Sequence, residues 1–233
     1  KAAATSFRSV REAKQCYGKF HEIINVSEAV QKSFWNALHL LKKGQVLYNT
    51  VNSKEILEKS KEKINLTKFK RNRSKIVSVG KLLKSKGFDR LLRIMVRLLK
   101  EGCKVHLYIL GDGPMKSEMR KYITDNYIEK YVDLLGYQLN PYKYIAKCDL
   151  FVCASYAEGF STAATEALIL GIPVCTVDVA GMKEMLGEND EYGIIVSNNE
   201  NALYEKIKLL VERNDLLDHY TRQAKKRGSI FCI

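Results

Sequence analysis

Short apolar runs alternate with amphipathic stretches along the chain from residue 75 onward, and this alternation limits the fold more than any other feature. The apolar runs have the length of buried strands, and the stretches between them carry apolar residues at helical spacing. Strands that alternate with helices in this way form a parallel sheet. The predicted strands span 75–80, 105–110, 132–135, 150–154, 174–179 and 192–197. The predicted helices span 88–100, 115–126, 161–170 and 199–213. The sequence therefore predicts an α/β domain with a Rossmann-like parallel sheet.

The length and composition are those of an ordinary globular protein. The 233 residues can form one large domain, or one domain and part of another. Hydrophobic residues make up 46% and charged residues 28%, as is usual for such proteins. No apolar run reaches the ~18 residues that a membrane span needs, and no signal peptide is visible. Since Lys1 is not an initiator methionine, we expect the chain to be a fragment or a processed product.

The first 74 residues carry a different pattern. Helices are predicted at 9–20 and from Ser27 to Leu41, with a short strand at 21–27 between them. The polar, lysine-rich stretch from Asn52 to Ser74 reads as a helix and a linker.

One stretch combines this pattern with chemical groups. The strand predicted at 150–154 leads through a turn with Glu158 and Gly159 to a helix that Ser161 or Thr162 can cap. Gly171 stands where a helix ends in a C′ glycine, and the next strand follows. In a parallel sheet such a strand–loop–helix–strand unit places its loop at the carboxyl edge, where ligands bind.

Two acids frame this loop and helix. Glu158 and Glu166 are eight positions apart, and the first amides of the helix lie between them. A helix N-terminus can hold a phosphate, and carboxylates accept hydrogen bonds from vicinal hydroxyls. A nucleotide-sugar fits that arrangement. Two glutamates at this spacing are also common, so on spacing alone a surface loop acid and a solvated helix residue are the better interpretation.

The segment E-G-F-S-T-A-A-T-E from Glu158 to Glu166 resembles the E-x7-E signature of the retaining, nucleotide-sugar-dependent glycosyltransferases of family 4, which have the GT-B fold. The resemblance extends from about Phe20 to about Leu210 and includes further motifs in the same order. It implies that Glu158 contacts the donor sugar and that Glu166 binds the ribose diol.

The end of the first predicted strand, V-G-K-L-L-K-S-K-G-F, resembles the V-G-R-L…K-G-F motif of the same family. By position, Lys81 and Lys86 would hold the donor diphosphate, with Lys84 as an alternative contact. Lys81 departs from the usual arginine and offers a point charge in place of a bidentate fork. Without the resemblance, lysines at these positions would indicate only a surface.

Three further segments resemble family motifs around the donor pocket. The Gly111-Asp112-Gly113 turn resembles one of them, although a tight turn after a strand explains it equally well. Tyr137, after Gly136, would stack on the base or merely cover the sheet edge. Glu184 lies in a loop resembling the G-G-x-x-E region, but alanine replaces its first glycine, which weakens any donor contact there.

The resemblance thus implies a complete candidate site. The catalytic residues are Glu158, Lys81 and Lys86. The donor-binding residues are Gly80, Gly111, Gly113, Gly136, Tyr137, Gly159, Phe160, Ser161, Thr162 and Glu166. We expect no metal and no cofactor beyond the nucleotide-sugar substrate, for which a UDP-sugar is the first choice.

The resemblance also implies an organisation and an activity. Residues 1–48 would be the tail of an N-terminal, acceptor-side Rossmann-like domain, 49–74 an interdomain linker, and 75–233 the C-terminal nucleotide-sugar-binding domain. The enzyme would transfer a sugar with retention to a glycan or lipid-linked acceptor in cell-surface polysaccharide or glycolipid synthesis. The 233 residues alone would bind donor but turn over poorly. The alternatives are an epimerase, a phosphorylase, or a non-catalytic subunit of the same fold.

Charge is concentrated at the front of the chain. Residues 1–75 contain 17 lysines and arginines but 6 acids, whereas the remainder is nearly balanced. Such a region fits an anionic membrane surface or a merely solvated face, and nucleic acid is disfavoured because no binding module accompanies it. The six cysteines form no C-x-x-C pair, which favours reduced thiols and a cytoplasmic setting. The basic front of the chain adds the expectation of peripheral association at the inner face of the membrane.

Two smaller expectations concern residues outside the proposed site. Arg90, Arg93, Arg97 and Lys100 recur along one helix, and the simplest interpretation of the stripe is a solvated face. His106 lies within a strand pattern and is predicted to be structural. Dinucleotide-binding G-x-G-x-x-G, Walker, G-x-S-x-G and H-E-x-x-H motifs are all missing from the sequence.

Overall fold

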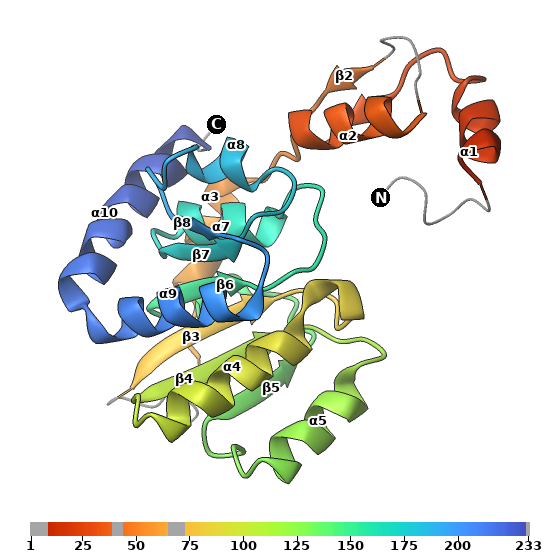
Figure 1. Cartoon of the computed structure of the whole chain (residues 1–233). Helices are drawn as coiled ribbons and strands as arrows, with labels where there is room; N and C mark the ends of the chain where they lie inside the picture. Colours follow the sequence, from red (N-terminus) through yellow and green to blue (C-terminus); the bar gives the residue numbers. More distant parts are fainter. Residues whose placement is uncertain (1–8, 39–43, 65–72, 232–233) are drawn as a thin grey trace.

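A computed structural model describes residues 9–38, 44–64 and 73–231. An N-terminal segment precedes a larger α/β domain (Figure 1). The segment consists of α1 (Val10–Tyr17), β1 (Ile24–Asn25), α2 (Glu28–Leu38) and β2 (Gln45–Val46). The two short strands pair in parallel, as expected for the tail of an α/β unit. Ser27 caps α2 as predicted, because its hydroxyl accepts the Val30 N–H at 3.2 Å. Residues 39–41 of the predicted helix lie outside the described residues.

A six-stranded parallel sheet forms the centre of the α/β domain and confirms the predicted Rossmann-like fold. Its order is β5-β4-β3-β6-β7-β8, and every neighbouring pair is parallel. The strands are β3 (Ser74–Val79), β4 (Val105–Leu110), β5 (Val132–Gly136), β6 (Leu150–Cys153), β7 (Val174–Val177) and β8 (Ile194–Val196). The chain first builds outward from β3 and then returns beside it with β6. This reversal creates a switch point between β3 and β6, where ligands bind in open α/β sheets.

Helices cover both faces of this sheet (Figure 1). Neighbouring strand residues alternate between the two faces, so that Ile76 packs in one apolar cluster and Val77 in the other. The first face carries α4 (Phe88–Lys100), α5 (Lys116–Asp125) and α9 (Glu200–Glu212). The second carries α6 (Tyr142–Ile145), α7 (Thr162–Ile169), α8 (Met182–Leu186) and α10 (Asn214–Ile230). Burial on both faces explains why the strands read as continuous apolar runs.

Between the two parts runs α3 (Ser53–Ser60), within the stretch predicted as a linker. Asn52 caps this helix by accepting the Glu55 N–H at 3.1 Å. It packs against α6 and α7, and the Asn140 side-chain amide donates to the Lys59 carbonyl at 2.9 Å. This helix therefore lies on the surface of the α/β domain, while the predicted boundaries at residues 48 and 74 stay a prediction.

The predicted solvated stripe on α4 is wrong for Arg90, Arg93 and Arg97, whereas Lys100 is exposed as predicted. Arg90 is only 2% exposed, because the Tyr156 ring lies 4.2 Å from its guanidinium carbon and Asn198 accepts a hydrogen bond from it at 2.9 Å. Arg93 donates to Glu200 at 2.8 Å and Arg97 to Asn201 at 2.7 Å. These arginines face α9, since α4 is covered by the sheet on one side and by α9 on another.

Two other expectations concern residues away from the sheet edge. His106 is buried in β4, with its Nε2 at 2.8 Å from an Asp133 carboxylate oxygen, which supports a structural role. The described cysteines are free thiols. They are Cys16, Cys103, Cys148, Cys153 and Cys175.

Candidate active site

The E-x7-E stretch folds as the sequence predicts. Ser161 caps α7 by accepting the Ala164 N–H at 3.3 Å, and Gly171 ends the helix with a positive φ of 71°. The exposed Thr162 begins the first turn of α7. The first amides of a helix have no intrahelical acceptor, so this turn presents donors and the positive end of a dipole to the switch point.

Glu158 and Lys86 form the centre of the site. The Lys86 ammonium lies 2.6 Å from Glu158 Oε1, and the Ser155 hydroxyl donates to the same oxygen at 2.8 Å. The Glu158 side chain is 9% exposed and the Lys86 side chain 30%. Residues 72 positions apart therefore meet across the switch point between β3 and β6. Without a ligand, each charge compensates the other.

Gly80 connects this pair to a larger cavity. A Cβ at Gly80 would lie 3.9 Å from the Lys86 side-chain carbons, so the lysine stem runs directly past this glycine. Gly80 also lines a cavity of about 590 Å³ at the ends of β3, β4 and β5. Lys81 lines the same cavity and is exposed. Both predicted lysines thus border one region, Lys86 at the ion pair and Lys81 at the cavity.

The predicted turn glycines divide into two groups. Gly111 lines the cavity and pinches against β3, since a Cβ there would lie 1.9 Å from the Gly80 carbonyl oxygen. Gly113 instead packs on the Leu82 backbone, and Gly136 accepts the Gly111 N–H at 2.8 Å. Neither of the last two is among the cavity-lining residues; both hold the turns together, and their donor contacts stay a prediction.

Tyr137 stands at the rim of the cavity with 74% of its surface exposed. Asp112 also lines the cavity and is paired with Lys116 at 2.6 Å, and its side chain accepts the Gly113 N–H. That arrangement supports the tight-turn interpretation of Asp112. Lys84 lines a different, smaller pocket with Asp89 and Arg93 and does not join Lys81.

Glu166 lies behind the cavity. The Tyr142 hydroxyl donates to a Glu166 carboxylate oxygen at 3.4 Å, and Tyr142 itself lines the cavity. Burial raises the pKa of Glu166 to about 7, and the hydrogen bond from Tyr142 only partly opposes this shift. Burial and the neighbouring acid raise the pKa of the Tyr142 phenol to about 12. Among the described residues Glu166 takes part in no ion pair, so its charge state depends on burial.

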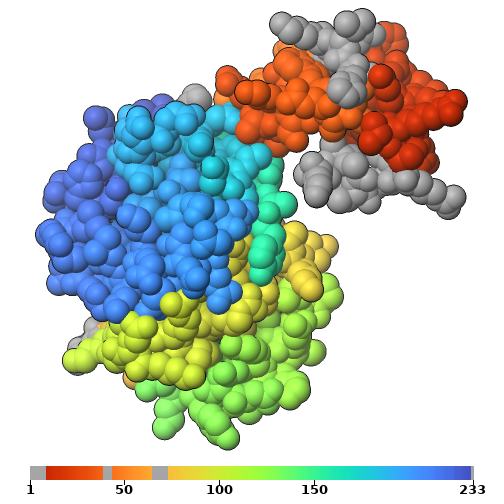
Figure 2. All heavy atoms as spheres, viewed as in Figure 1, coloured from red at the N-terminus to blue at the C-terminus, as the bar shows by residue number. Residues whose placement is uncertain are grey.

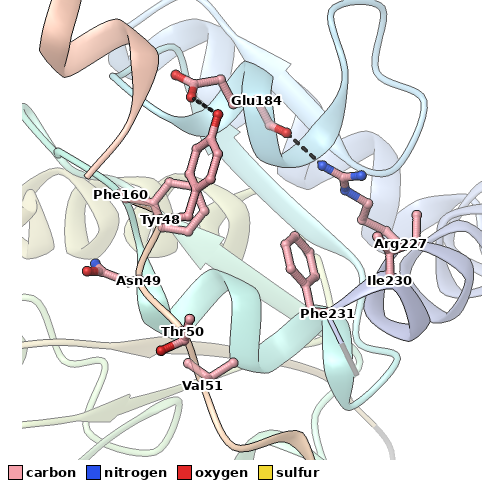
Figure 3. A pocket seen from close by; sticks show the side chains of 9 residues that line it. All are labelled: Tyr48, Asn49, Thr50, Val51, Phe160, Glu184, Arg227, Ile230 and Phe231. Carbon is pink, nitrogen blue, oxygen red and sulfur yellow. Dashed lines mark hydrogen bonds between the residues drawn. The ribbon is translucent and has the colours of Figure 1, made fainter. Parts of the chain in front are cut away.

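Gly159 and Phe160 point away from this cavity, toward the N-terminal segment. The Gly159 carbonyl accepts the Ser27 hydroxyl at 3.0 Å. Phe160 lines a second cavity, of about 530 Å³, together with Tyr48 and Arg227 (Figure 3). In this structure they shape the loop that carries Glu158, and their role in donor binding stays a prediction.

Three residues of the site escaped prediction. Ser155 and Tyr142 each hold one of the two glutamates, and Tyr48 packs on Phe160 with ring centroids 5.4 Å apart and ring planes tilted by 52°. Ser155 lies three residues before Glu158, which is a short-range signal that sequence reading could have used. Tyr142 and Tyr48 are remote in sequence from their partners, and nothing local marks them.

Neither metal-site nor membrane-span geometry was found in the described part of the chain. No group of three or more His, Cys, Asp or Glu side chains is arranged to hold a metal ion there. Among the described helices, none is both long and apolar enough to cross a bilayer.

Comparison with known proteins shows which family the chain belongs to. The family model described as glycosyl transferases group 1 matches residues 59–227. A Campylobacter jejuni protein, N-acetylgalactosamine-N,N'-diacetylbacillosaminyl-diphospho-undecaprenol 4-alpha-N-acetylgalactosaminyltransferase, is 38% identical over 193 residues, which are 82% of this chain and 50% of that protein. The poly(ribitol-phosphate) alpha-N-acetylglucosaminyltransferase of Staphylococcus aureus is 28% identical over 149 residues, covering 64% of this chain and 30% of its own. The chain thus spans about half the length of the first relative and less of the second.

Solved structures share the fold at low sequence identity. Anabaena HepE in complex with UDP has a TM-score of 0.79 at 22% identity, over 95% of this chain and 62% of that one. The sucrose-phosphate synthase of Thermosynechococcus elongatus has a TM-score of 0.80 at 16% identity, over 99% and 60%. With the family match over residues 59–227, these folds lead to one conclusion: the chain belongs to the glycosyl transferases group 1 and has the GT-B type of α/β fold.

Proposed function

We propose that this chain is the donor-binding part of a retaining, family 4 glycosyltransferase that moves a sugar from a nucleotide-sugar to a glycan or lipid-linked acceptor. The observation that carries the proposal is the meeting of Lys86 and Glu158 at the switch point, beside the cavity that Gly80 and Lys81 line. Paired opposite charges next to free helix amides suit a ligand that has a diphosphate on one side and hydroxyls on the other.

In this proposal the nucleoside occupies the cavity of about 590 Å³, a size within the usual range for small-molecule sites. Tyr137 stacks on the base from the rim, and Glu166 accepts the ribose hydroxyls with Tyr142 beside it. A UDP-sugar is the donor we favour, because the structural relative HepE was solved with UDP. No other cofactor enters the proposal.

The proposed chemistry replaces one bond at the anomeric carbon. The bond from this carbon to the diphosphate oxygen breaks and its electron pair leaves with the diphosphate, while the acceptor hydroxyl oxygen bonds to the same face and its proton passes to the departing diphosphate oxygen. Lys81, Lys86 and the α7 amides at Thr162 stabilise the charge that develops on the leaving diphosphate. Glu158 is held by its ion pair with Lys86 and faces the donor sugar. When the diphosphate binds, Lys86 is shared between it and Glu158.

The acceptor side rests on the relatives. By their names, one relative acts on a diphospho-undecaprenol-linked sugar and another on poly(ribitol phosphate). We therefore place the acceptor among glycans and lipid-linked precursors of cell-surface polymers. Residues 1–48 would belong to the acceptor-side domain, 49–74 would link it to the donor domain at 75–233, and the basic front of the chain would touch an anionic membrane at its cytoplasmic face. Flotation with anionic vesicles at low and high salt tests that contact, and no association in either condition rejects it.

Donor binding is tested on the 233-residue chain. In a thermal-shift screen of UDP-, GDP- and ADP-sugars, we expect the UDP-sugars to raise the melting temperature most. The effect is measurable, because a ligand at 100 times its Kd stabilises the folded protein by about 2.7 kcal/mol. Transfer is then measured with the longest natural form of the protein, and NMR of the product assigns the anomeric configuration. An inverted product would exclude the retaining mechanism. Turnover of the UDP-sugar without acceptor would instead indicate an epimerase.

A further inference from the structure

Glu184 of α8 connects three separate parts of the chain. Its Oε2 accepts the Glu28 N–H at 2.9 Å, and its Oε1 accepts the Ala29 N–H at 2.9 Å. The Tyr48 hydroxyl donates to Oε2 at 2.9 Å (Figure 3). The two amides belong to α2 of the N-terminal segment and Tyr48 follows β2, whereas Glu184 belongs to the α/β domain. Figure 2 shows the segment meeting the domain in this region, where α8 lies.

The contact supplies what the first turn of α2 lacks. The opening amides of a helix need acceptors from outside it, and a carboxylate there also meets the positive end of the dipole. Ser27 satisfies only the Val30 amide. Glu184, 155 and 156 positions away in sequence, satisfies the two amides before it. Docking of α2 and completion of its cap are therefore a single event.

Glu184 is itself held in place from the opposite side. Arg227 of α10 donates to the Glu184 carbonyl at 2.7 Å through Nη2 and to the Met185 carbonyl at 2.7 Å through Nε. These bonds fix the C-terminal half of α8, a helix of only five residues. The carboxylate thus projects from a restrained backbone.

The same interface encloses the loop that carries Glu158. Ser27 is fully buried, and its hydroxyl donates to the Gly159 carbonyl at 3.0 Å. Val26 and Val30 of the N-terminal segment pack closely on Gly159. From the α8 side, Gly181 comes so close that a Cβ would lie 2.7 Å from the Gly159 carbonyl oxygen and 2.9 Å from the Phe160 ring. The loop is held between two surfaces.

We infer that Glu184 is a latch: it holds α2 and Tyr48 on the α/β domain and thereby keeps the 158–160 loop in the position that transfer requires. This inference rests on the proposed function. Glu184 is a positioning residue in it, because it acts through Ser27, Gly159 and Phe160 and lies outside the cavity at Gly80 and Tyr142. The latch should control the rate of transfer and leave nucleotide binding almost unchanged.

Amide hydrogen exchange of the 233-residue chain tests the latch without any activity. In Glu184→Gln, the Glu28 and Ala29 amides should exchange about 10-fold faster or more, because a charge-assisted acceptor is replaced by an amide that also carries donors. Glu188→Gln is the matched control, since Glu188 is on the same surface and its side chain is 74% exposed. Equal exchange in the two variants would overturn the latch.

Kinetics of the longest natural form of the protein test its consequence. Glu184→Gln should lower kcat by up to about 100-fold, as expected for a misplaced loop, while the Kd for UDP changes less than about 2-fold. Tyr48→Phe removes one of the three hydrogen bonds and should give a smaller loss, and it guards against a folding defect in Glu184→Gln. Glu184→Asp, which keeps the charge, should recover part of the rate. A parallel loss of UDP affinity and kcat would reject the latch in favour of a direct donor contact.

The two failures are distinguishable. If the wild-type protein transfers no sugar but the Glu28 and Ala29 amides still respond to Glu184→Gln, the proposed function falls and the latch stands as a device of the fold. If transfer is active and retaining but neither exchange nor kcat distinguishes Glu184→Gln from Glu188→Gln, the latch falls and the function stands.

Discussion

The two ends of the candidate site hold the same kind of acid in opposite circumstances. At the switch point Glu158 has Lys86 at 2.6 Å and a hydroxyl from Ser155. Behind the cavity Glu166 has one long hydrogen bond, from Tyr142, and burial raises its pKa to about 7. The first end is an ion pair, whereas burial leaves the second poised between charged and neutral near physiological pH. The eight-residue spacing that unites the pair in sequence thus says nothing about the charge that each carries.

The largest effect should follow from Glu158→Gln. This change keeps the shape but removes the charge opposite Lys86, and we expect kcat to fall by about 100- to 1,000-fold, the range for loss of one preorganised electrostatic group. Steady-state transfer from a UDP-sugar by the longest natural form of the protein measures it. Activity within 2-fold of the wild type would remove Glu158 from the mechanism. The ion pair of Glu158 would then have no catalytic role that distinguishes it from Glu166.

Glu166→Gln should remove a dependence of stability on pH. A carboxyl whose pKa is raised by folding stabilises the protein below its ordinary pKa of 4.5 and loses that contribution as pH rises through about 7. Between pH 5 and 8 the wild type should therefore lose roughly 2–3 kcal/mol more than Glu166→Gln, from a shift of that size. Urea unfolding of both proteins across this range measures the difference. Parallel curves would show that Glu166 is ionised at both ends of the range.

Lys86→Met should isolate the ion pair at the switch point. The variant keeps most of the apolar stem but leaves the Glu158 carboxylate, 9% exposed, with Ser155 alone, and we expect a loss of about 1–2 kcal/mol. The double change Lys86→Met with Glu158→Gln should recover stability but not transfer. Urea unfolding measures the stability of each variant. Lys84→Met is the control, because Lys84 is exposed and lies outside the cavity at Gly80.

The smallest effect concerns the cavity rim. Tyr137→Ala should weaken UDP binding by about 5- to 10-fold, since stacking of an aromatic side chain on a base contributes roughly 1–3 kcal/mol and this ring is largely exposed. Calorimetry with the 233-residue chain measures it. Tyr127→Ala, at a tyrosine that is 86% exposed and outside the cavity, should leave the affinity unchanged. If both variants bind equally well, Tyr137 only covers the sheet edge.

The sheet was predictable because its strands are buried on both faces and therefore read as apolar runs. The helix α10 was not predicted, since its contact with α7 uses small residues: a Cβ at Gly228 would lie 2.1 Å from the Leu168 carbonyl oxygen. A helix that packs through a glycine shows no stripe of large apolar residues. Arg90 was wrongly predicted to be solvated. An arginine covered by Tyr156 and Asn198 has the same sequence pattern as an arginine in solvent, so the sequence could not show its burial.

The site was predictable where it is local or carried by a motif. The cap at Ser161 and the approach of Lys86 to Glu158 follow from the loop–helix unit and from the family resemblance. The partners that fix the charge states could not be predicted, because Tyr142 and Glu166 meet only through the packing of α6 on α7. The contact of Glu184 with the start of α2 likewise depends on how two parts of the chain dock, which no local pattern encodes.

The pinch between Gly80 and Gly111 has a consequence for how such a site can diversify. The backbones at the ends of two strands touch there, so backbone atoms set the distance between the strand ends. The sequence only has to keep these two positions free of side chains. The neighbouring Tyr137, Gln138 and Leu139 stand on the rim and bear none of that contact. Under the proposed donor binding, preference for one base or another can be changed at the rim by exchanging a few side chains, while the backbone framework stays as it is.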